Sequence, residues 1–575
     1  MLKLMKYLKP FSLSIIFIIL LVFLQTIFQL YLPTLMSSIV DIGIVNKDIS
    51  YIFRIGGVML LVSIGGAICT ILSSYLSART GTGFSKIIRE KLFARVEDFS
   101  LQEFDVLGTA SLINRTTNDI TQVEQVTIMV LRMMISAPLM AVGGILMAVS
   151  KDARLSLLLV VVLPVLMALI FLLSRKIIPL FKKMQKKIDR VSLIIRENLT
   201  GVRVIRAFNR MGYESKRYDL ANRDLTDNAI RVNKIMAVAM PMMMFLMNIT
   251  TVAVVWFGGF RIDNGAMQVG DLMAFIQYIM QIMFAFLIFS MMFVMIPRAS
   301  VSAERINEVL ETKRSIEDPD EVMEIGEEKG YLEFRDVSFN YFGAEEPAIS
   351  NISFSANPGE VTAVIGSTGS GKSTLVNLIP RFYDVEQGNI LIDGVDIRKL
   401  TVQQLRSRIG FVPQKAVLFS GTIAENIRYG KEDATDEEVR HAAEIAQAEE
   451  FINTLDKGYD TFIEQGGVNL SGGQKQRLSI ARALIKRPEI YIFDDSFSAL
   501  DFKTEARLRA GLKGEIATAT VIFVAQRVSS VMSADRIIVL DQGKISGIGT
   551  HSELLNESEV YRQIVSSQLS EEEIA

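Results

Sequence analysis

Six long apolar runs in the first half of the chain constrain its fold more than any other feature of the sequence. Each run is close to the ~20 residues that a helix needs to cross ~30 Å of hydrocarbon at ~1.5 Å per residue. The sequence therefore predicts six transmembrane helices, over residues 11–33, 52–77, 127–150, 155–174, 235–260 and 272–296. The first run is too long for a removable signal peptide and lacks a small-residue cleavage site, so we count it as a span.

Lysine and arginine are unevenly distributed among the segments that flank these runs. The N-terminus carries three lysines, residues 79–125 carry six basic residues and residues 175–234 carry sixteen. The other connecting loops are short, and their basic residues are Lys47, Lys151, Arg154 and Arg261. Because basic residues favour the cytoplasmic side of a membrane, we expect the N-terminus and both long segments in the cytoplasm.

Both long basic segments have polar and apolar residues at helical spacing. This pattern predicts helices that continue well beyond the bilayer. Such helices would place a short turn far out in the cytosol, and we expect these turns near Gly108–Asp119 and near Phe208–Glu214. The alternative is a pair of soluble loops with no mechanical role.

Few polar side chains fall inside the apolar runs, namely Gln25, Gln29, Arg132, Asn248, Gln277 and Gln281. A charge within a span is costly and marks a candidate site, and Arg132 is therefore one. The alternative is that Arg132 extends to the cytoplasmic interface. The last two runs hold twelve of the 27 methionines. Methionine offers adaptable apolar surface, which suits a cavity for varied amphipathic molecules but equally suits lipid contact and helix packing.

The chain changes character near residue 310. Residues 311–330 are charged and are predicted to be a linker, after which short apolar strands alternate with glycine turns and helical stretches. We therefore predict a membrane domain over 1–310, an α/β domain over 331–568 and an acidic tail over 569–575. The net charge of −2 gives no basic field for nucleic acid. The single cysteine excludes an intrachain disulfide and a cysteine-cluster metal site.

A phosphate-binding motif follows the apolar strand "EVTAVI" in the second half. The sequence "GSTGSGKST" has the pattern G-x-x-x-x-G-K-S, between an expected strand and an expected helix. Its glycines let backbone N–H groups surround phosphates, its lysine meets the β/γ charge and its serine hydroxyl reaches Mg²⁺. The predicted nucleotide-contacting residues here are Gly366, Ser367, Thr368, Gly369, Ser370, Gly371, Lys372, Ser373 and Thr374.

Other candidates lie at the ends of expected strands. Tyr341 precedes the motif by twenty-five residues and could stack on adenine. Gln414 ends the strand "GFVPQ", where an amide can touch both Mg²⁺ and a neighbouring domain. Asp494 ends the strand 490–494 and could hold Mg²⁺ through water, and Gln526 ends the strand "TVIFVAQ".

A second anion-binding element is expected at the start of a basic helix within "NLSGGQKQR". Small residues ahead of a helix expose its first N–H groups, and the helix dipole favours negative charge there. The candidate residues are Ser471, Gly472, Gly473 and Gln474.

In combination, these motifs resemble an ATP-binding cassette (ABC) exporter half, and the resemblance covers nearly the whole chain. It rests on the phosphate loop, the signature "LSGGQ", the turn "SALD" and three strand ends, at 366–374, 470–474, 498–501, Gln414, Asp494 and Gln526. The resemblance implies an all-α transmembrane domain followed by an α/β P-loop domain. It also implies an ATPase-coupled transporter that uses ATP and Mg²⁺. The compact chain and its short outer loops suggest a bacterial inner membrane.

The resemblance further implies a head-to-tail dimer. In the family, each ATP lies between the phosphate loop of one half and the signature of the other. The two cytoplasmic turns resemble coupling helices that dock on the nucleotide domains. ATP would draw those domains together and turn the cavity from inward-facing to outward-facing, and hydrolysis would reset it.

Two positions depart from the family pattern. Asp495 stands where the family normally has Glu, the residue that polarises the attacking water, and Gln526 stands where it usually has His. Losing one methylene withdraws the carboxylate by over ~1 Å, and a misplacement of that size can cost about 10²-fold in rate. We therefore expect this chain's own site to bind ATP and hydrolyse it slowly. The chain's two histidines, His441 and His551, offer no obvious substitute.

The intact signature then predicts a heterodimer, in which a second, different half supplies Glu and His and this half supplies "LSGGQ". The expected cargo is a hydrophobic or amphipathic compound, a drug or a lipid, and membrane lipid is a further partner. The alternatives are a homodimeric exporter in which Asp and Gln suffice, and an ATP-binding regulatory subunit without transport. An importer is disfavoured, because importers usually carry spans and nucleotide domains on separate chains.

Overall fold

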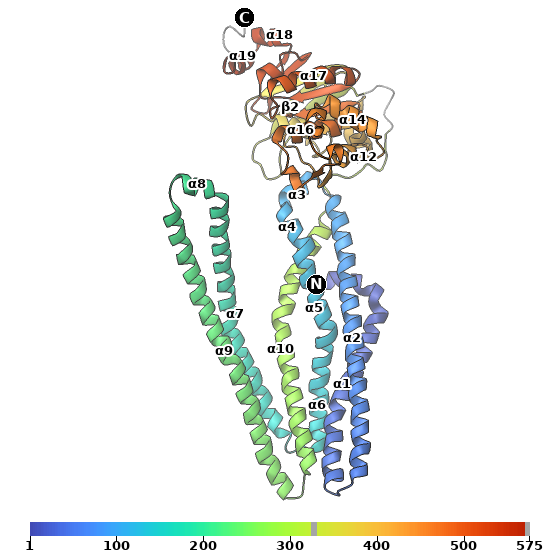
Figure 1. The fold of residues 1–575 in the computed structure, drawn as a ribbon, viewed down its shortest axis with the longest axis vertical. Coiled ribbons are helices and arrows are strands. Elements are labelled where there is room, and N and C mark those ends of the chain that lie inside the picture. The colour runs from blue at the N-terminus through green and yellow to red at the C-terminus, as the bar shows by residue number, and fades with distance from the viewer. Residues whose placement is uncertain (324–329, 570–575) are drawn as a thin grey trace. The chain divides into compact units, whose positions relative to one another are not determined.

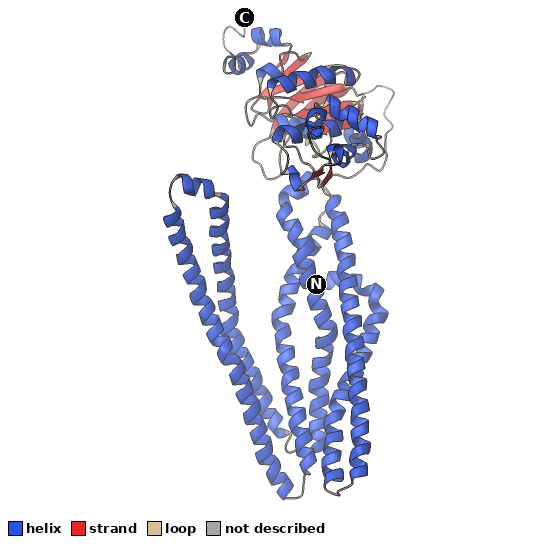
Figure 2. Ribbon diagram, viewed as in Figure 1, coloured by secondary structure: helices blue, strands red, loops and turns tan. Residues whose placement is uncertain are grey.

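A computed structural model of the chain describes residues 1–323 and 330–569 (Figure 1). It divides into two compact units, residues 1–97 with 110–312 and residues 98–109 with 313–575. The described part of the first unit is helical, and the second contains the strands (Figure 2). The helical membrane domain and the α/β domain predicted from the sequence are therefore both present. Of the predicted linker and tail, residues 324–329 and 570–575 lie outside the described residues.

In the described part of the chain, six helical stretches are long and apolar enough to cross a membrane, which confirms the predicted number. They are Lys3–Ile44, Ile49–Glu97, Thr109–Lys151, Leu157–Thr200, Met211–Asp263 and Val269–Glu311. Their principal helices are α1 (Ser12–Ser38), α2 (Ile49–Glu97), α4 (Thr109–Asn114), α5 (Ile120–Met129), α6 (Ile135–Lys151), α7 (Leu157–Thr200), α9 (Met211–Asp263) and α10 (Val269–Glu311).

Several of these helices continue far past the length of a bilayer crossing. Helix α2 has 49 residues and α9 has 53, which correspond to about 70–80 Å at ~1.5 Å per residue. The helical spacing in the long basic segments therefore predicted extended helices correctly. The turn at Phe208–Arg210, between α8 (Val202–Ala207) and α9, also lies where the sequence indicated.

The first cytoplasmic turn lies earlier than predicted. The chain turns between the end of α2 at Glu97 and Gly108, and residues 109–119 are helical. Within this turn is a short helix, α3 (Leu101–Leu107), which begins because Ser100 and Glu103 form a reciprocal capping box. It ends at Gly108, whose φ of 75° suits glycine. The prediction at Gly108–Asp119 was wrong because a polar helical stretch resembled a loop.

Side chains that are buried between helices hold the first unit together. Apolar residues of α6, α7, α9 and α10 form one cluster, at the centre of which Tyr278 is fully buried. The Tyr278 hydroxyl donates to the Leu30 carbonyl at 3.1 Å and lies 2.6 Å from the Thr34 hydroxyl. Near the start of α10, Asp271 accepts from Lys151 at 2.6 Å and from Ser37 at 2.8 Å. These polar contacts join α1, α6 and α10 at points where burial alone would leave polar groups unpaired.

The second unit is built on a six-stranded sheet in the order β12-β11-β3-β10-β9-β6. All neighbouring pairs are parallel except β11 and β12. The strands are β3 (Val361–Gly366), β6 (Ile409–Val412), β9 (Ile490–Asp494), β10 (Thr520–Val524), β11 (Arg536–Asp541) and β12 (Lys544–Gly549). Because β3, β6, β9 and β10 are parallel, the segments that follow them emerge at one edge, and this edge carries the candidate site.

A four-stranded antiparallel sheet packs alongside, in the order β2-β1-β4-β5. Its strands are β1 (Leu332–Phe339), β2 (Ile349–Ala356), β4 (Gln387–Ile392) and β5 (Val395–Asp396), and a two-stranded sheet joins β7 (Gly421–Thr422) to β8 (Phe462–Ile463). The helices are α11 (Lys372–Leu378), α12 (Val402–Ser407), α13 (Ile423–Arg428), α14 (Asp436–Ile445), α15 (Glu449–Ile452), α16 (Gly472–Leu484), α17 (Phe502–Glu515), α18 (His551–Glu557) and α19 (Glu559–Ser566).

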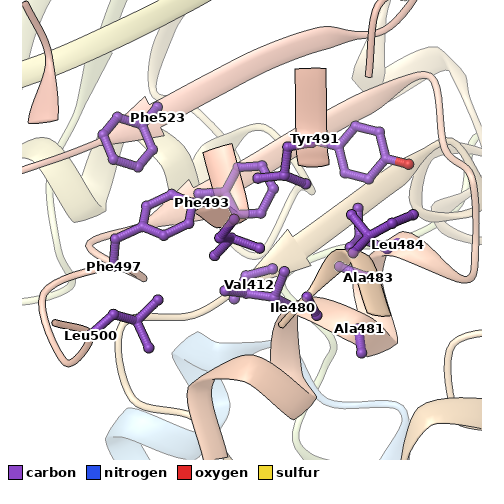
Figure 3. Close-up of a cluster of buried hydrophobic side chains, with 14 of the residues drawn as sticks. Val412, Ile480, Ala481, Ala483, Leu484, Tyr491, Phe493, Phe497, Leu500 and Phe523 are labelled. Carbon is purple, nitrogen blue, oxygen red and sulfur yellow. The ribbon is translucent and has the colours of Figure 1, made fainter. Parts of the chain in front are cut away.

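The largest core lies between the six-stranded sheet and its helices. Strand β9 is buried at every position, as expected for a central parallel strand. Figure 3 shows Tyr491 and Phe493 of this strand beside Ile480 and Leu484 of α16, all within one apolar cluster. This packing fixes the end of β9, where Asp494 lies.

Candidate functional site

The phosphate loop joins β3 to α11, as the motif predicted. Gly369 and Gly371 have positive φ angles of 84° and 95°, which glycine adopts readily. A Cβ on Gly371 would lie 2.8 Å from the Ala348 carbonyl oxygen, and one on Gly366 would lie 2.2 Å from that of Leu540. The loop therefore admits only glycine at these points, and α11 begins directly after it.

Lys372 bends back across this loop. Its ammonium group donates to the carbonyls of Gly366 at 2.9 Å and Ser367 at 2.7 Å. Burial lowers the pKa of Lys372, while the charges of Asp495 and Asp494 act in the opposite direction. A buried cation held only by neutral carbonyls is suited to binding an anionic group such as a terminal phosphate.

The oxygen donors expected for Mg²⁺ lie together beside the lysine. The Ser373 hydroxyl donates to an Asp494 carboxylate oxygen at 3.2 Å. Burial is the largest influence on Asp494 and raises its pKa, and the charge of Asp495 raises it further. A cation between these groups would stabilise the ionised carboxylates and so oppose the effect of burial on the pKa of Asp494.

Asp495 is held by two amides at once. Gln414 donates to its Oδ2 at 3.1 Å and Gln526 donates to the same oxygen at 2.9 Å. The backbone of Asp495 is left-handed, with φ 48°, and its N–H donates to the Val524 carbonyl at 3.0 Å. Burial raises the pKa of Asp495, opposed by the Gln414 hydrogen bond and by the charge of Lys372. The parallel strands β6, β9 and β10 bring these three side chains together.

Tyr341 also reaches the phosphate loop. Its hydroxyl lies 3.0 Å from that of Thr374, and its ring lies edge-on to Phe339, with the ring centroids 5.0 Å apart. Tyr383, which no sequence motif indicated, packs its ring edge-on against Tyr341, with the ring centroids 5.5 Å apart. Its hydroxyl donates to Asp105 of α3 at 2.8 Å. The signal in the sequence is weak, because Tyr383 lies in an ordinary turn and its partner is 278 residues away.

These residues line one cavity of about 340 Å³. Its lining includes Tyr341, Thr368, Gly369, Gly371, Lys372, Ser373, Thr374, Gln414, Asp494, Asp495 and Gln526, together with Ala348 and Val524, which sequence reasoning missed. The loop residues that do not line the cavity in the described structure are Gly366, Ser367 and Ser370. The Ser370 hydroxyl is buried and has no hydrogen-bond partner within the described chain.

The signature residues lie outside this lining and form a separate helix start. Ser471 caps α16, in a reciprocal box with Gln474: the Ser471 N–H donates to Gln474 Oε1 at 2.8 Å, and the Gln474 N–H donates to Ser471 Oγ at 3.3 Å. Gly472 and Gly473 form the first turn of the helix. The geometry provides free N–H groups of the kind that bind anions, while the capping box shows that the site is already stable without a ligand.

The cavity fits a Mg²⁺ nucleotide. Within the described residues, no cluster of three or more His, Cys, Asp and Glu is arranged to hold a metal alone. Magnesium does not require one, because it binds through one or two protein oxygens, water and substrate phosphates. Ser373, Asp494 and Gln414 could supply those oxygens, Lys372 and the loop N–H groups could hold phosphates, and Tyr341 could face the base.

The two histidines contribute nothing to this cavity, as the sequence indicated. His441 Nε2 lies 2.7 Å from a Glu515 carboxylate oxygen, and His551 Nδ1 lies 2.7 Å from the Tyr561 hydroxyl. Neither residue lines the cavity.

Comparison with known proteins agrees with the fold and the site. Residues 15–286 match the family described as the ABC transporter transmembrane region, and residues 349–498 match the ABC transporter family. An uncharacterized ABC transporter ATP-binding protein of Mycobacterium tuberculosis is 43% identical over 567 residues, which are 98% of this chain and 97% of that protein. The ATP-dependent lipid A-core flippase of Chromobacterium violaceum is 31% identical, over 93% of this chain and 92% of that protein.

A solved structure of a bacterial Atm1-family ABC exporter with ATP bound has the same fold, with a TM-score of 0.81 at 26% identity, over 97% of this chain and 98% of that chain. The helical membrane region and the single nucleotide-binding domain thus define an exporter half-transporter. The chain belongs to the ABC transporter family and carries an ATP-binding domain of that family.

Proposed function

We propose that this chain is one half of a heterodimeric ABC exporter, in which its own ATP site is slow and its signature completes the fast site of a different partner. The observation that carries this proposal is the hydrogen bonding of Asp495. Its Oδ2 accepts from two amides, and the carboxylate is one methylene shorter than the Glu expected there.

The first support is geometric. A general base must come within ~2.6–3.2 Å of the proton that it takes, and a shortfall of ~1 Å can cost about 10²-fold. The Asp495 carboxylate is withdrawn by its length and tied back by Gln414 and Gln526. Gln526 cannot act as an imidazole would, and the chain's histidines are engaged elsewhere. These features favour ATP that is bound and seldom cleaved.

The second support is the signature. Its residues keep the family sequence, and Ser471 forms a regular capped helix start outside the chain's own cavity. In the proposed dimer the signature closes the partner's ATP site, and the partner supplies the Glu and His that this chain lacks.

The cargo that we propose is a hydrophobic or amphipathic compound, either a drug or a lipid. The methionine-rich spans α9 and α10 support this, as does the lipid A-core flippase among the relatives. Basic residues are concentrated in the segments next to α2, α7 and α9, which supports an inner-membrane protein with its N-terminus and ATP domain in the cytoplasm.

The test is to ask which chain holds which nucleotide. The complex that contains this chain is purified, incubated with Mg²⁺ and photoreactive ATP, trapped with vanadate and cross-linked. We expect intact ATP on this chain and trapped ADP on a different partner chain. Equal amounts of trapped ADP on two copies of this chain would favour a homodimeric exporter. Nucleotide binding without movement of any amphiphile in vesicles would favour a regulatory subunit.

A further inference from the structure

A second cavity lies within the membrane unit and contains Arg132, a charged residue of the apolar run 127–150. It has a volume of about 330 Å³, a size that accommodates a small ligand. Helices α1, α2, α6 and α10 and the π-helical turn Val130–Met134 form its wall. The lining combines apolar side chains such as Phe284 with a polar set: Gln25, Gln29, Ser73, Arg132, Ser136 and Gln281.

The charge of Arg132 is unpaired among the residues that the structure describes. Its guanidinium makes no hydrogen bond or ion pair with any described residue, and it lies in the wall of the cavity. The six apolar runs contain no Asp or Glu. The nearest acid in sequence to these runs is Asp271, which is engaged by Lys151 and Ser37. A lone cation at the membrane is costly and is normally paired, so the cavity lacks an anion.

The backbone at Arg132 is also unusual. Residues Val130–Met134 form a π-helical turn between α5 and α6, a feature that is rare and frequently found at functional sites because it changes which side chains face inward. Gln25 and Gln29 are one turn apart on α1 and face the same cavity. The Gln281 Nε2 donates to the Gln29 carbonyl at 3.4 Å, while its buried Oε1 has no partner in the described structure.

The polar groups are ordered by depth. Arg132 precedes Lys151, at the end of α6, by 19 residues, or about 28 Å along the helix. Gln281 follows Asp271, near the start of α10, by ten residues, or about 15 Å. Since the hydrocarbon layer is ~30 Å thick, Arg132 lies near one boundary and Gln281 near mid-depth. The cavity can thus hold a charged headgroup at the boundary and an apolar chain farther in.

We propose that this cavity binds anionic amphiphiles, with Arg132 pairing their phosphate or carboxylate group and Gln25 and Gln281 hydrogen-bonding the rest of the headgroup. The inference deepens the proposed export function and rests on it for orientation, which places Arg132 at the cytoplasmic leaflet. In this proposal, the charge of Arg132 selects anionic amphiphiles over cationic ones.

The test is equilibrium binding without ATP, using the full chain with its co-purifying partner in nanodiscs of neutral phosphatidylcholine. The probes are dodecyl phosphate and dodecyltrimethylammonium, which share a tail and differ in charge. We expect selective binding of dodecyl phosphate, a loss of about tenfold or more in its affinity for Arg132→Gln, and partial recovery in Arg132→Lys. The matched control is Arg175→Gln, which removes an exposed arginine of α7 that does not line the cavity.

Equal binding of the two probes by the unaltered protein would overturn the proposal, and so would unchanged dodecyl phosphate affinity in Arg132→Gln, the result expected if Arg132 only reaches the interface. If that variant does not fold, the probe selectivity of the unaltered protein still decides. Displacement of dodecyl phosphate by added phosphatidylglycerol would identify lipid as the source of the headgroup, and displacement only by soluble anions would identify a soluble one. ATP-driven movement of the probes is measured separately, so that anion binding without transport would refute the export function alone.

Discussion

At the scale of single residues, the central feature of the site is one carboxylate oxygen that accepts hydrogen bonds from two amide groups. Gln414 and Gln526 both donate to Asp495 Oδ2, and each amide lowers the ability of that oxygen to accept a proton from water. The neighbouring Lys372 is bound to loop carbonyls. The site therefore provides strong binding groups for phosphates and a short carboxylate that two amides hold in place.

Restoring the longer side chain should accelerate hydrolysis. We expect Asp495→Glu combined with Gln526→His to raise ATP turnover at this chain's site by up to about 10²-fold, because the base regains its reach. The measurement is single-turnover release of phosphate by protein that contains only this chain. Asp495→Asn is the control, since it has the length of Asp and no basic oxygen. No gain in the double variant would contradict the geometric argument.

Burial of Asp495 also predicts a pH dependence of stability. Its pKa is raised from 3.8 by burial, so the folded state binds its proton more tightly than the unfolded chain. The associated stability is fully present below pH 3.8 and is lost as the pH rises through the raised pKa. Asp495→Asn has no such loss. We expect calorimetry on nucleotide-free protein to show that the variant gains stability relative to the unaltered protein as the pH rises from 3.8 through the raised pKa of Asp495, whereas a constant difference would contradict this.

At the scale of secondary-structure elements, the notable connection is between α3 and the nucleotide-binding fold. The hydroxyl of Tyr383 donates to Asp105 of α3, and the Tyr383 ring packs against Tyr341 at the nucleotide cavity. Ser315, just after α10, donates its N–H to Glu103 of α3 at 2.9 Å. The start of the predicted linker, at Ser315, thus contacts α3, which belongs to the same compact unit as the nucleotide-binding fold.

Removing the Tyr383 hydroxyl should weaken coupling and spare nucleotide binding. Tyr383→Phe keeps the ring against Tyr341 and loses one partly exposed hydrogen bond to a carboxylate, worth about 1 kcal/mol. We expect ATP affinity to change less than about twofold, while stimulation of ATPase by transported amphiphile falls severalfold. Tyr459→Phe is the matched control, since the Tyr459 hydroxyl has no partner in the described chain. Equal stimulation in all three proteins would show that the contact carries no coupling.

Much at this scale could be predicted from the sequence, because the information is local. Apolar runs indicated the six spans, and the phosphate loop, the capped helix α16 and the strand that ends at Asp494 follow from short motifs. The first cytoplasmic turn was predicted too late in the chain, because the seven-residue helix α3 within it gives little periodicity. The pairing of Tyr383 with Asp105, and of two glutamines with one aspartate, depends on strand order and long-range packing, which no local pattern encodes.

At the scale of the whole molecule, the account requires that two unequal sites form between two chains. The signature start at Ser471 lies on a different part of the nucleotide-binding unit from the cavity that Lys372 lines. In the proposed dimer, one chain therefore offers half of each site: its phosphate loop holds one ATP, and its signature acts on the ATP of the partner.

This division predicts that one substitution impairs one site and spares the other. Gly473→Asp places a negative side chain at the first turn of α16, where the helix dipole otherwise favours phosphate. In the complex, we expect ATPase activity to fall more than about tenfold while this chain still retains its own bound ATP. Gly514→Asp is the control, because a Cβ on that exposed helical glycine meets nothing within 4 Å. Loss of ATP from this chain in Gly473→Asp would contradict the division.

The most direct test of the central claim is the steady-state ATPase rate of pure protein made only of copies of this chain, compared at equal concentration with the complex that contains its partner. The account predicts that copies of this chain bind ATP but turn it over at least about tenfold more slowly than the complex. Turnover by this chain alone at the rate of the complex would show that Asp495 and Gln526 suffice, and would contradict the pairing of unequal halves.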